Sequence, residues 1–313
     1  MSASIGGTQF QSYDFGFGTG GKNREDLLDI IVNIAPWETP LFSAAPKTTA
    51  RHTTHEWIED TLANATAWAG GAAEGADFSG NTLLTRSRLS NWTMIFRKDV
   101  TVSETQRAVN PAGIKDEYAY QMSIAMKEIG RSIEYRLFAT GASATASGAA
   151  RVMKVLDDFI STNTASGSAM DKTLLDSLIE KCFIAGGIPD RVYCHPNTKS
   201  KFAANLGGAS TVNYRNIAAS DARVVGNIDV YISNFGVINL VPDRFIPTAG
   251  ATTGYGRFWL IEQPKVRVAF LRPIKHVPLP PNGDSVRGMI LGELTLEVMA
   301  ETAHAKAINV TAG

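Results

Sequence analysis

The stretch from residue 113 to residue 141 constrains the fold more than any other part of the chain. Its apolar side chains recur at helical spacing and form one stripe, made by Ile114, Tyr118, Met122, Ile129, Ile133 and Leu137. Near or opposite that stripe lie Lys127, Glu128, Arg131 and Glu134. About 26 helical residues span close to 40 Å, whereas a compact chain of 313 residues has a radius of gyration of about 20 Å. The pattern therefore predicts one long helix that acts as a spine.

Residues 47–102 are predicted to form one long two-stranded ribbon. The first strand, 48–62, is rich in Thr, His and Trp, and the second, 86–102, alternates apolar and polar residues apart from one shift of phase after Leu89. The connection between them, 64–80, is mostly Ala and Gly. An isolated hairpin is only marginally stable in water. A ribbon of this length must therefore rest on other protein surface, either in its own domain or on a neighbouring subunit.

The rest of the chain mixes short helices and strands, which indicates an α+β fold. Residues 1–22 hold aromatics without periodicity, and two interpretations stay open: a disordered tail, or an arm that lies across a neighbouring subunit. A short helix is predicted from Asn23 to Pro36. Beyond a linker of small residues at 141–150, helices are predicted at 174–183 and 197–206, a hairpin at 223–241, and strands at 191–194, 258–261, 266–270, 289–298 and 305–310.

Composition excludes several classes of protein. A hydrophobic content of 44% is far above the disordered range, and 30 basic residues balance 30 acidic ones. That balance argues against nucleic-acid binding by the whole chain, because affinity for phosphate comes from an excess of Lys and Arg. Cys182 and Cys194 are too few for a disulfide framework and are predicted to be buried thiols. Neither a signal peptide nor an apolar run of about 18 residues is visible.

The segment Gly16-Phe-Gly-Thr-Gly-Gly-Lys-Asn23 has the glycine and lysine positions of a phosphate-binding loop. Such a loop requires a Ser or Thr hydroxyl for magnesium where this chain has Asn23, and it follows a buried strand, whereas the residues before Gly16 are polar. A nucleotide-dependent enzyme is therefore a remote alternative.

Other candidate chemical groups also favour a structural interpretation. His52 and His55 are three residues apart in a predicted strand, so their rings point to opposite faces rather than to one metal ion. Adjacent Cys194 and His195 are separated in the same way, which disfavours a thiolate–imidazole pair. We predict a protein that is not an enzyme and that holds no cofactor or metal.

The predicted ribbon carries carboxylates on its first strand (Glu56, Glu59, Asp60) and arginines on its second (Arg86, Arg88, Arg97). These charges pair either across the ribbon or with a neighbouring subunit, where complementary charges fix the register. Its tryptophans either pack locally or anchor an interface. The residues expected at contacts between subunits are Phe15, Phe17, Trp57, Trp68, Glu74, Arg86, Arg88 and Trp92.

Short motifs along the whole chain follow one another in a specific order. They are Asn23-Arg-Glu-Asp-Leu27, Pro36-Trp-Glu-Thr-Pro-Leu41, His55-Glu-Trp57, Glu74-Gly-Ala-Asp77, Ala185-Gly-Gly-Ile-Pro-Asp190, Asp229-Val-Tyr-Ile-Ser233, Pro242-Asp-Arg-Phe245, Leu271-Arg-Pro273, Gly283-Asp-Ser285, Glu293-Leu-Thr-Leu-Glu-Val298 and Ala303-His304. In this order the chain resembles the major capsid (head) proteins of tailed bacteriophages, which have the Hong Kong 97-type shell fold.

The resemblance implies a division of the chain into five parts. Residues 1–46 would be the N-terminal arm, 47–102 the extended loop, 103–151 the peripheral domain with the spine helix, 152–271 the axial domain, and 272–313 the C-terminal strands of the peripheral domain.

The resemblance also implies a function and partners. The chain would self-assemble in the host cytoplasm, through hexamers and pentamers, into the icosahedral head of a virion that encloses double-stranded DNA without sequence-specific or membrane binding. A separate scaffolding protein, a portal and a decoration protein are the expected partners. The founding member links its subunits through a lysine of the extended loop, but no Lys lies between Lys47 and Lys98 here. An encapsulin-type compartment, which holds a cargo enzyme instead of DNA, is the alternative within the same fold.

Overall fold

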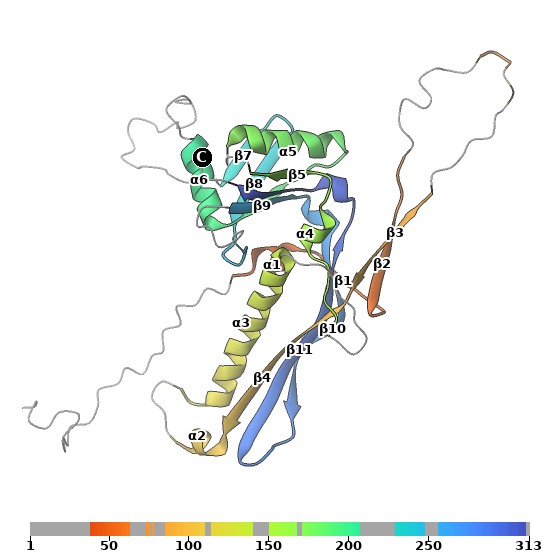
Figure 1. Cartoon of the computed structure of the whole chain (residues 1–313). Coiled ribbons are helices and arrows are strands. Elements are labelled where there is room, and N and C mark those ends of the chain that lie inside the picture. Colours follow the sequence, from red (N-terminus) through yellow and green to blue (C-terminus); the bar gives the residue numbers. More distant parts are fainter. Residues whose placement is uncertain are drawn as a thin grey trace, which may run out of the picture.

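In the computed structural model, the described residues are 38–62, 73–75, 77, 85–109, 114–139, 150–167, 171–206, 229–247 and 256–310. They form a four-stranded sheet, a six-stranded sheet and a separate two-stranded ribbon (Figure 1). The class is α+β, as predicted. Among the helices in these ranges, none combines the length and the apolarity that crossing a membrane requires.

Helix α3 (Glu117–Phe138) runs along the four-stranded sheet, in the order β1 (Lys47–Thr49), β10 (Val266–Leu279), β11 (Ser285–Val298) and β4 (Met94–Ser103) (Figure 1). The helix begins at Asp116, whose Oδ1 accepts a hydrogen bond from the Tyr118 backbone N–H at 3.0 Å. Its 22 residues span about 33 Å at about 1.5 Å per residue. The predicted spine helix is therefore confirmed, with its start three to four residues later than the sequence pattern indicated.

The apolar stripe of α3 packs on the sheet. Ile129, Ile133 and Leu137 share one core with side chains of β4, β10 and β11. The polar face differs from the expectation at one position, because Glu134 is fully buried rather than directed to solvent.

The six-stranded sheet has the order β5 (Thr164–Ser166), β12 (Ala305–Val310), β9 (Gly256–Ile261), β6 (Arg191–Cys194), β8 (Gly236–Pro242) and β7 (Val230–Ser233). Helices α5 (Lys172–Ile184) and α6 (Pro196–Leu206) pack against one face of it. Successive side chains of β6 point to opposite faces of the sheet and so enter two different cores. Val192 lies in the core beneath α5, and Tyr193 lies in the core that the sheet shares with α3. Both faces of the central strands are thus buried.

The ribbon is shorter than predicted. Within its described residues, the strands that pair with each other are β2 (Thr54–Glu59) and β3 (Ser87–Trp92), antiparallel, from Thr54↔Trp92 to Glu59↔Ser87. Strand β4 pairs instead with β11, and β1 pairs in parallel with β10. The reason is burial: Phe96, Val100 and Val102 form one apolar face of β4, and that face packs in the core under α3. Alternation predicted the strand correctly but assigned it the wrong partner.

Short elements complete the described part of the chain. Helix α1 (Pro40–Ala44) packs on α3, and α2 (Glu104–Ala108) follows β4 with Ser103 as its N-cap. Helix α4 (Leu156–Phe159) lies beside the base of the ribbon, and 3-10 turns span Gln263–Lys265 and Glu301–Ala303. The last strand, β12, pairs with β9 and β5 in the six-stranded sheet rather than with β10 or β11.

Candidate inter-subunit contact site

The base of the β2–β3 ribbon is held by buried hydrogen bonds. Asn91 is fully buried, and its Nδ2 donates to the backbone oxygens of Leu296 (2.7 Å) and Lys154 (3.1 Å). Its Oδ1 accepts from the Lys154 N–H at 2.7 Å. One side chain therefore joins β3 to β11 and to the segment before α4. Because a buried amide that loses its partners is destabilising, these bonds favour one position of the ribbon.

The other strand of the ribbon is fixed by three further contacts. His55 Nε2 lies 3.1 Å from Glu297 Oε2, and Glu59 Oε1 accepts from the Ala300 N–H at 2.7 Å. Trp57 is 9% exposed, and its ring centroid lies 5.8 Å from that of Phe159 on α4. The inner face of β2 is thus bound to its own subunit.

A buried carboxylate with two partly exposed arginines lies where β3 passes into β4. Glu293 on β11 is 3% exposed and accepts hydrogen bonds from Thr93 Oγ1 (2.7 Å), Arg151 Nη2 (2.5 Å) and Arg272 Nε (2.9 Å). Burial alone raises the pKa of this carboxyl, but the three donors outweigh burial and lower its pKa below the ordinary value. Glu293 is therefore held as a carboxylate that fastens the linker before α4 to the sheet.

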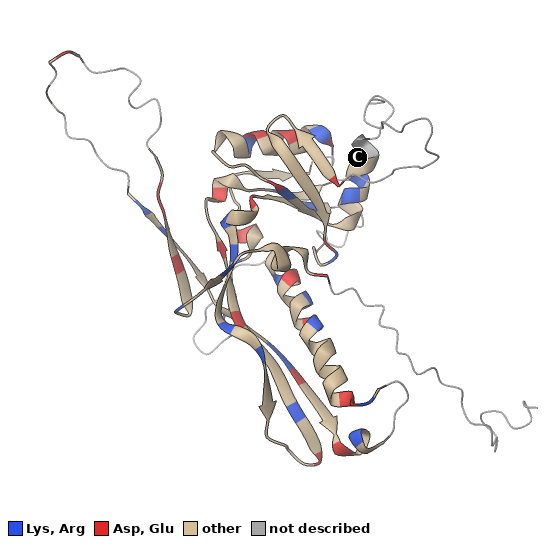
Figure 2. Ribbon diagram, turned by 180° about the vertical axis from the view of Figure 1, so that it is seen from behind, with Lys and Arg blue, Asp and Glu red and all other residues tan. Residues whose placement is uncertain are grey.

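The predicted charges of the ribbon pair within the chain. Arg86 Nε lies 3.0 Å from Asp60 Oδ2, with the two side chains 72% and 55% exposed. Arg88 pairs with Glu56, and both groups are also exposed. Figure 2 shows charges of both signs along the ribbon, at the left, and over the helices and strands beside it. Cross-strand pairing, one of the two interpretations left open, is therefore present, and the contact of these arginines with a neighbour stays a prediction.

The other expected contact residues divide into three groups. Trp57 is buried at the ribbon base, as local packing predicts, and Trp92 is half-buried at the end of β3. Glu74 is exposed in a turn with Gly75, whose φ is +78°. Phe15, Phe17 and Trp68 lie outside the described residues, as does the Gly16–Asn23 loop.

Two exposed apolar residues of the ribbon were missed by sequence reasoning. Ile58 is 69% exposed and Leu62 is 97% exposed. Ile58 stands opposite Arg88 in the ribbon, on the face away from Trp57. The signal was present in the alternation of β2, because burying Trp57 forces its neighbour Ile58 outward. Side chains of this kind in solvent mark a contact surface when they gather on one projecting element.

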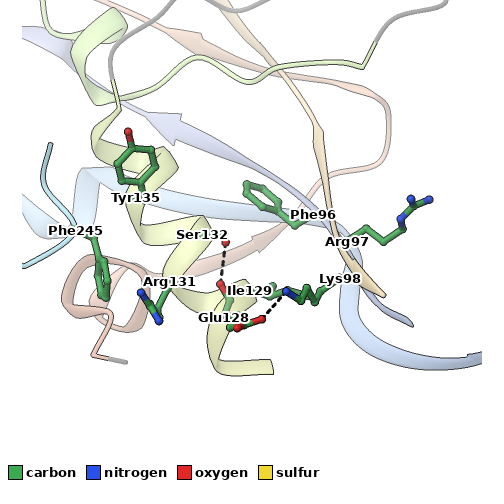
Figure 3. A pocket seen from close by; sticks show the side chains of 9 residues that line it. All are labelled: Phe96, Arg97, Lys98, Glu128, Ile129, Arg131, Ser132, Tyr135 and Phe245. Carbon is green, nitrogen blue, oxygen red and sulfur yellow. Dashed lines mark hydrogen bonds and ion pairs between the residues drawn. The ribbon is translucent and has the colours of Figure 1, made fainter. Parts of the chain in front are cut away.

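A groove of about 470 Å³ lies between α3 and β4 (Figure 3). Lys98 on β4 reaches across to Glu128 on α3 at 2.9 Å, and the guanidinium of Arg131 lies over the ring of Phe245, 5.4 Å from its centroid. The hydroxyl of Ser132 donates to the backbone oxygen of Glu128 at 2.8 Å, so its proton is held by a carbonyl oxygen and not by a basic side chain. The groove is a mixed polar and apolar surface, with the chemistry of a binding surface rather than of a catalytic centre.

The remaining chemical candidates are structural where they are described. The Nδ1 of His52 accepts the N–H of Thr54 at 3.2 Å, while His55 faces Glu297. Burial raises the pKa of the Cys194 thiol to about 12 and lowers the pKa of His195, so neither group is poised as a reactive pair. Within the described part of the chain, no three His, Cys, Asp or Glu residues gather as a metal site.

A spine helix beside a long sheet, a mixed second unit and a projecting ribbon define a shell-forming subunit of the Hong Kong 97 type. Solved structures of known shell proteins have the same fold. The cyanophage A-1(L) capsid matches with a TM-score of 0.70 and 12% identity, over 92% of this chain and 97% of that one. The capsid of cyanophage P-SCSP1u matches with a TM-score of 0.60 and 13% identity, over 94% of both chains. The SrpI encapsulin of Synechococcus elongatus matches with a TM-score of 0.59 and 12% identity, over 93% of both.

At these identities the structural matches show the fold alone, and the family comes from the sequence. Residues 5–311 match the SU10 major capsid protein family, and the chain belongs to that family. No curated protein matched. The protein is therefore a major capsid protein, a structural component of the virion and not an enzyme, which forms the icosahedral head of a tailed phage as a shell of many copies.

Proposed function

We propose that the subunits assemble through hexamers and pentamers, and that the β2–β3 ribbon of each subunit contacts a neighbouring subunit. The observation that carries this proposal is the contrast between the two faces of the ribbon. Its inner face is bound to its own subunit through Asn91, His55 and Trp57, while its outer face presents exposed Ile58. A projecting element with a fixed base, whose outer face presents an exposed apolar side chain among charged ones, is suited to reach another subunit without losing much conformational entropy on binding.

The residues expected at subunit contacts take different parts in this proposal. The outward charges Glu74, Arg86 and Arg88 would set register with the neighbour, and Trp92 would support the end of the ribbon. Trp57, buried in its own subunit, would act by aiming the ribbon. Phe15, Phe17 and Trp68 are proposed as contacts from their sequence alone.

The arm (1–46), the extended loop (47–102), the peripheral domain (103–151 with 272–313) and the axial domain (152–271) are proposed with refinements at their boundaries. Strands β1 and β4 fall in the range of the extended loop but pair with β10 and β11, so they are better counted with the peripheral domain. Strand β12 (Ala305–Val310) is better counted with the axial domain, because its strand partners β9 and β5 belong there.

The proposed contents and partners rest on charge and on the family. With 30 basic and 30 acidic residues, interspersed over the described elements (Figure 2), the shell would enclose double-stranded DNA without gripping it. A separate scaffolding protein, a portal and a decoration protein are proposed as partners of assembly. The encapsulin-type alternative shares the fold but not the family of this chain, and the contents of the particle test the proposed DNA cargo.

The test is assembly of the purified chain, observed by mass photometry and negative-stain imaging over a range of salt and protein concentrations. We expect closed shells or ring-sized oligomers from the parent chain. Ile58→Asp should block closed shells, and Ile58→Val, the matched control, should not. Since Ile58 is 69% exposed, neither substitution should lower the thermal unfolding temperature much. Normal shells from Ile58→Asp would remove the outer face of the ribbon from the contact. Particles from infected cells that contain a cargo enzyme instead of DNA would favour the compartment.

A further inference from the structure

The unit around the six-stranded sheet exposes an unusual amount of apolar surface. Six large apolar side chains in that unit are between 47% and 77% exposed: Phe183, Ile184, Ile188, Val230, Ile232 and Val237. They make up half of the exposed large apolar side chains in the described part of the chain. Large apolar side chains that are exposed and gather in one region mark an interaction site on a soluble protein.

Three of these residues form a sheet patch, defined as Val230, Ile232 and Val237. Strand β7 is the edge strand, and Ile232 stands opposite Val237 in its pairing with β8. The adjacent residues Tyr231 and Ile238 point the other way, into the core with α5. Because side chains alternate along a strand, the sheet patch lies on the face of the sheet away from α5.

The other three form a helix-end patch, defined as Phe183, Ile184 and Ile188, at the C-terminal end of α5 and the turn after it. The turn is fixed. The Gly187 N–H donates to the Cys182 oxygen at 2.8 Å, and the Ile188 N–H donates to Glu262 Oε2 at 3.0 Å. A Cβ at Gly187 would lie 2.4 Å from the Cα of Ala303, so the turn sits directly on the protein body. The patch is therefore held in place before any partner binds.

Both patches lie at the same end of the unit. Ile232 and Val237 flank the β7–β8 turn, and the ring of Phe183 lies 5.0 Å from the ring of Phe235 in that turn. Two apolar patches on opposite faces of one tip are what a subunit of a closed ring needs, because a head-to-tail contact uses two different surfaces of each copy. A two-fold contact would need only one self-complementary surface.

We propose that the sheet patch of one subunit packs against the helix-end patch of the next copy of this chain, around the axis of a ring. This proposal rests on the proposed assembly through hexamers and pentamers and assigns the surfaces that close those rings. Both patches consist of uncharged side chains, so they cannot bind phosphate. A partner that fits them is a second apolar surface. A shell built from copies of this chain supplies that surface from the neighbouring subunit.

The test uses Ile232→Asp and Ile184→Asp, each 77% exposed in the parent chain, with Ile232→Val and Ile184→Val as matched controls. Each Asp variant destroys one patch and leaves the other intact. We expect neither to form rings or shells, and both controls to do so. Circular dichroism and thermal unfolding of each variant verify that it is folded.

Mixing the two Asp variants distinguishes a head-to-tail contact from a two-fold contact between identical patches. The intact sheet patch of Ile184→Asp can pack on the intact helix-end patch of Ile232→Asp, so an equimolar mixture should give dimers that neither variant gives alone. Mass photometry reads this directly. Normal shells from either Asp variant, or a mixture with no more dimer than its components while the parent assembles, would overturn the assignment of the patches and leave the ribbon contact standing. A parent chain that formed no ring or shell would contradict the ring assembly itself.

Discussion

Glu134 on the spine helix accepts the backbone N–H of Leu41 at 2.7 Å through Oε1, while its Oε2 accepts the N–H of Phe42 at 2.8 Å. Both Glu134 and Leu41 are fully buried, so this carboxyl fastens α1, and with it the root of the N-terminal arm, to the spine. The carboxyl group of Asp243, after β8, interacts with the carboxyl group of Glu134 and raises its pKa. Two buried carboxyl groups in close interaction disfavour the doubly ionised state, so the pair holds a proton up to a higher pH than a free carboxyl group does.

That proton makes stability depend on pH. Burial, and next the charge of Asp243, raises the pKa of Glu134 to about 8, from an ordinary value of 4.5. The native state therefore binds more protons than the unfolded state between about pH 4.5 and 8, and the unfolding free energy must fall as pH rises through that window. We expect Glu134→Gln to remove the part of this slope that comes from Glu134, because an amide does not titrate in this pH range.

The measurement is urea unfolding of parent and variant at a series of pH values from 5 to about 8.5, read as the difference between the two curves. Lys47 and His195 face the pair and remain in both proteins, so their titration largely cancels. The buried His304, whose pKa burial lowers to about 4, gives the opposite slope between about 4 and 6.5 and also cancels. Glu128→Gln, on the exposed face of the same helix, is the control. A difference curve that is flat across this range would show that Glu134 is ionised throughout.

An exchange of charges separates the two interpretations of the ribbon arginines. Arg88→Glu breaks the pair with Glu56, and the double variant Glu56→Arg/Arg88→Glu restores it with the charges reversed. Because both groups are exposed, we expect each variant to change the unfolding free energy by no more than about 1 kcal/mol. If Arg88 meets a neighbouring subunit, the double variant should assemble as poorly as the single one, which light scattering measures. Recovery of normal assembly in the double variant would confine Arg88 to its own chain.

The buried amide of Asn91 should be the most sensitive polar position of the ribbon base. Asn91→Ala removes two donated bonds and one accepted bond, and leaves the Lys154 N–H without that partner. We expect a loss of about 2–4 kcal/mol in unfolding free energy, since each buried group left unpaired costs about 1–3 kcal/mol. Ser90→Ala, one position along the same strand, should cost less than about 1 kcal/mol. Equal losses at the two positions would mean that the ribbon base is not held by Asn91.

Local patterns in the sequence predicted the elements better than their partners. The helix at 117–138 was predictable because its period is a property of neighbouring residues. The pairing of β4 with β11 was not, because alternation reports a half-buried strand without naming the strand beside it. The burial of Glu134 was also beyond reach, since its partners Leu41 and Asp243 come from distant segments.

For the proposed contact surfaces too, local features could be predicted from the sequence and features that depend on the whole fold could not. The pairing of the exposed charges of the ribbon could be predicted, because arginines and carboxylates on the same face of two paired strands come within reach, as Arg88 does diagonally from Glu56. The patches around Ile184 and Ile232 could not be predicted from the sequence. An apolar residue in a helix or strand is expected in the core, and only the fold shows that these two side chains are exposed.

A last expectation concerns the turn that carries the helix-end patch. Gly186 and Gly187 are adjacent, but each excludes a side chain for a different reason. Gly186 has a φ of +85° and open space around it. At Gly187, a Cβ would lie 2.4 Å from the Cα and 2.6 Å from the Cβ of Ala303. Gly186→Ala should therefore cost only the strain of a left-handed conformation, about 1–2 kcal/mol. Gly187→Ala must instead push the turn away from backbone, which moves Ile188 and the end of α5.

We expect Gly187→Ala to lower the unfolding free energy more than Gly186→Ala and, if it folds, to reduce ring and shell formation by displacing the patch. Urea unfolding measures the first effect, and mass photometry at equal folded concentration measures the second. Gly186→Ala serves as the matched control because it adds the same methyl group one residue away. Because Gly187 meets backbone atoms that no change of rotamer can move, the larger effect at this position follows from packing alone. If both variants assembled equally well at equal folded concentration, the turn would not take part in the contact between subunits.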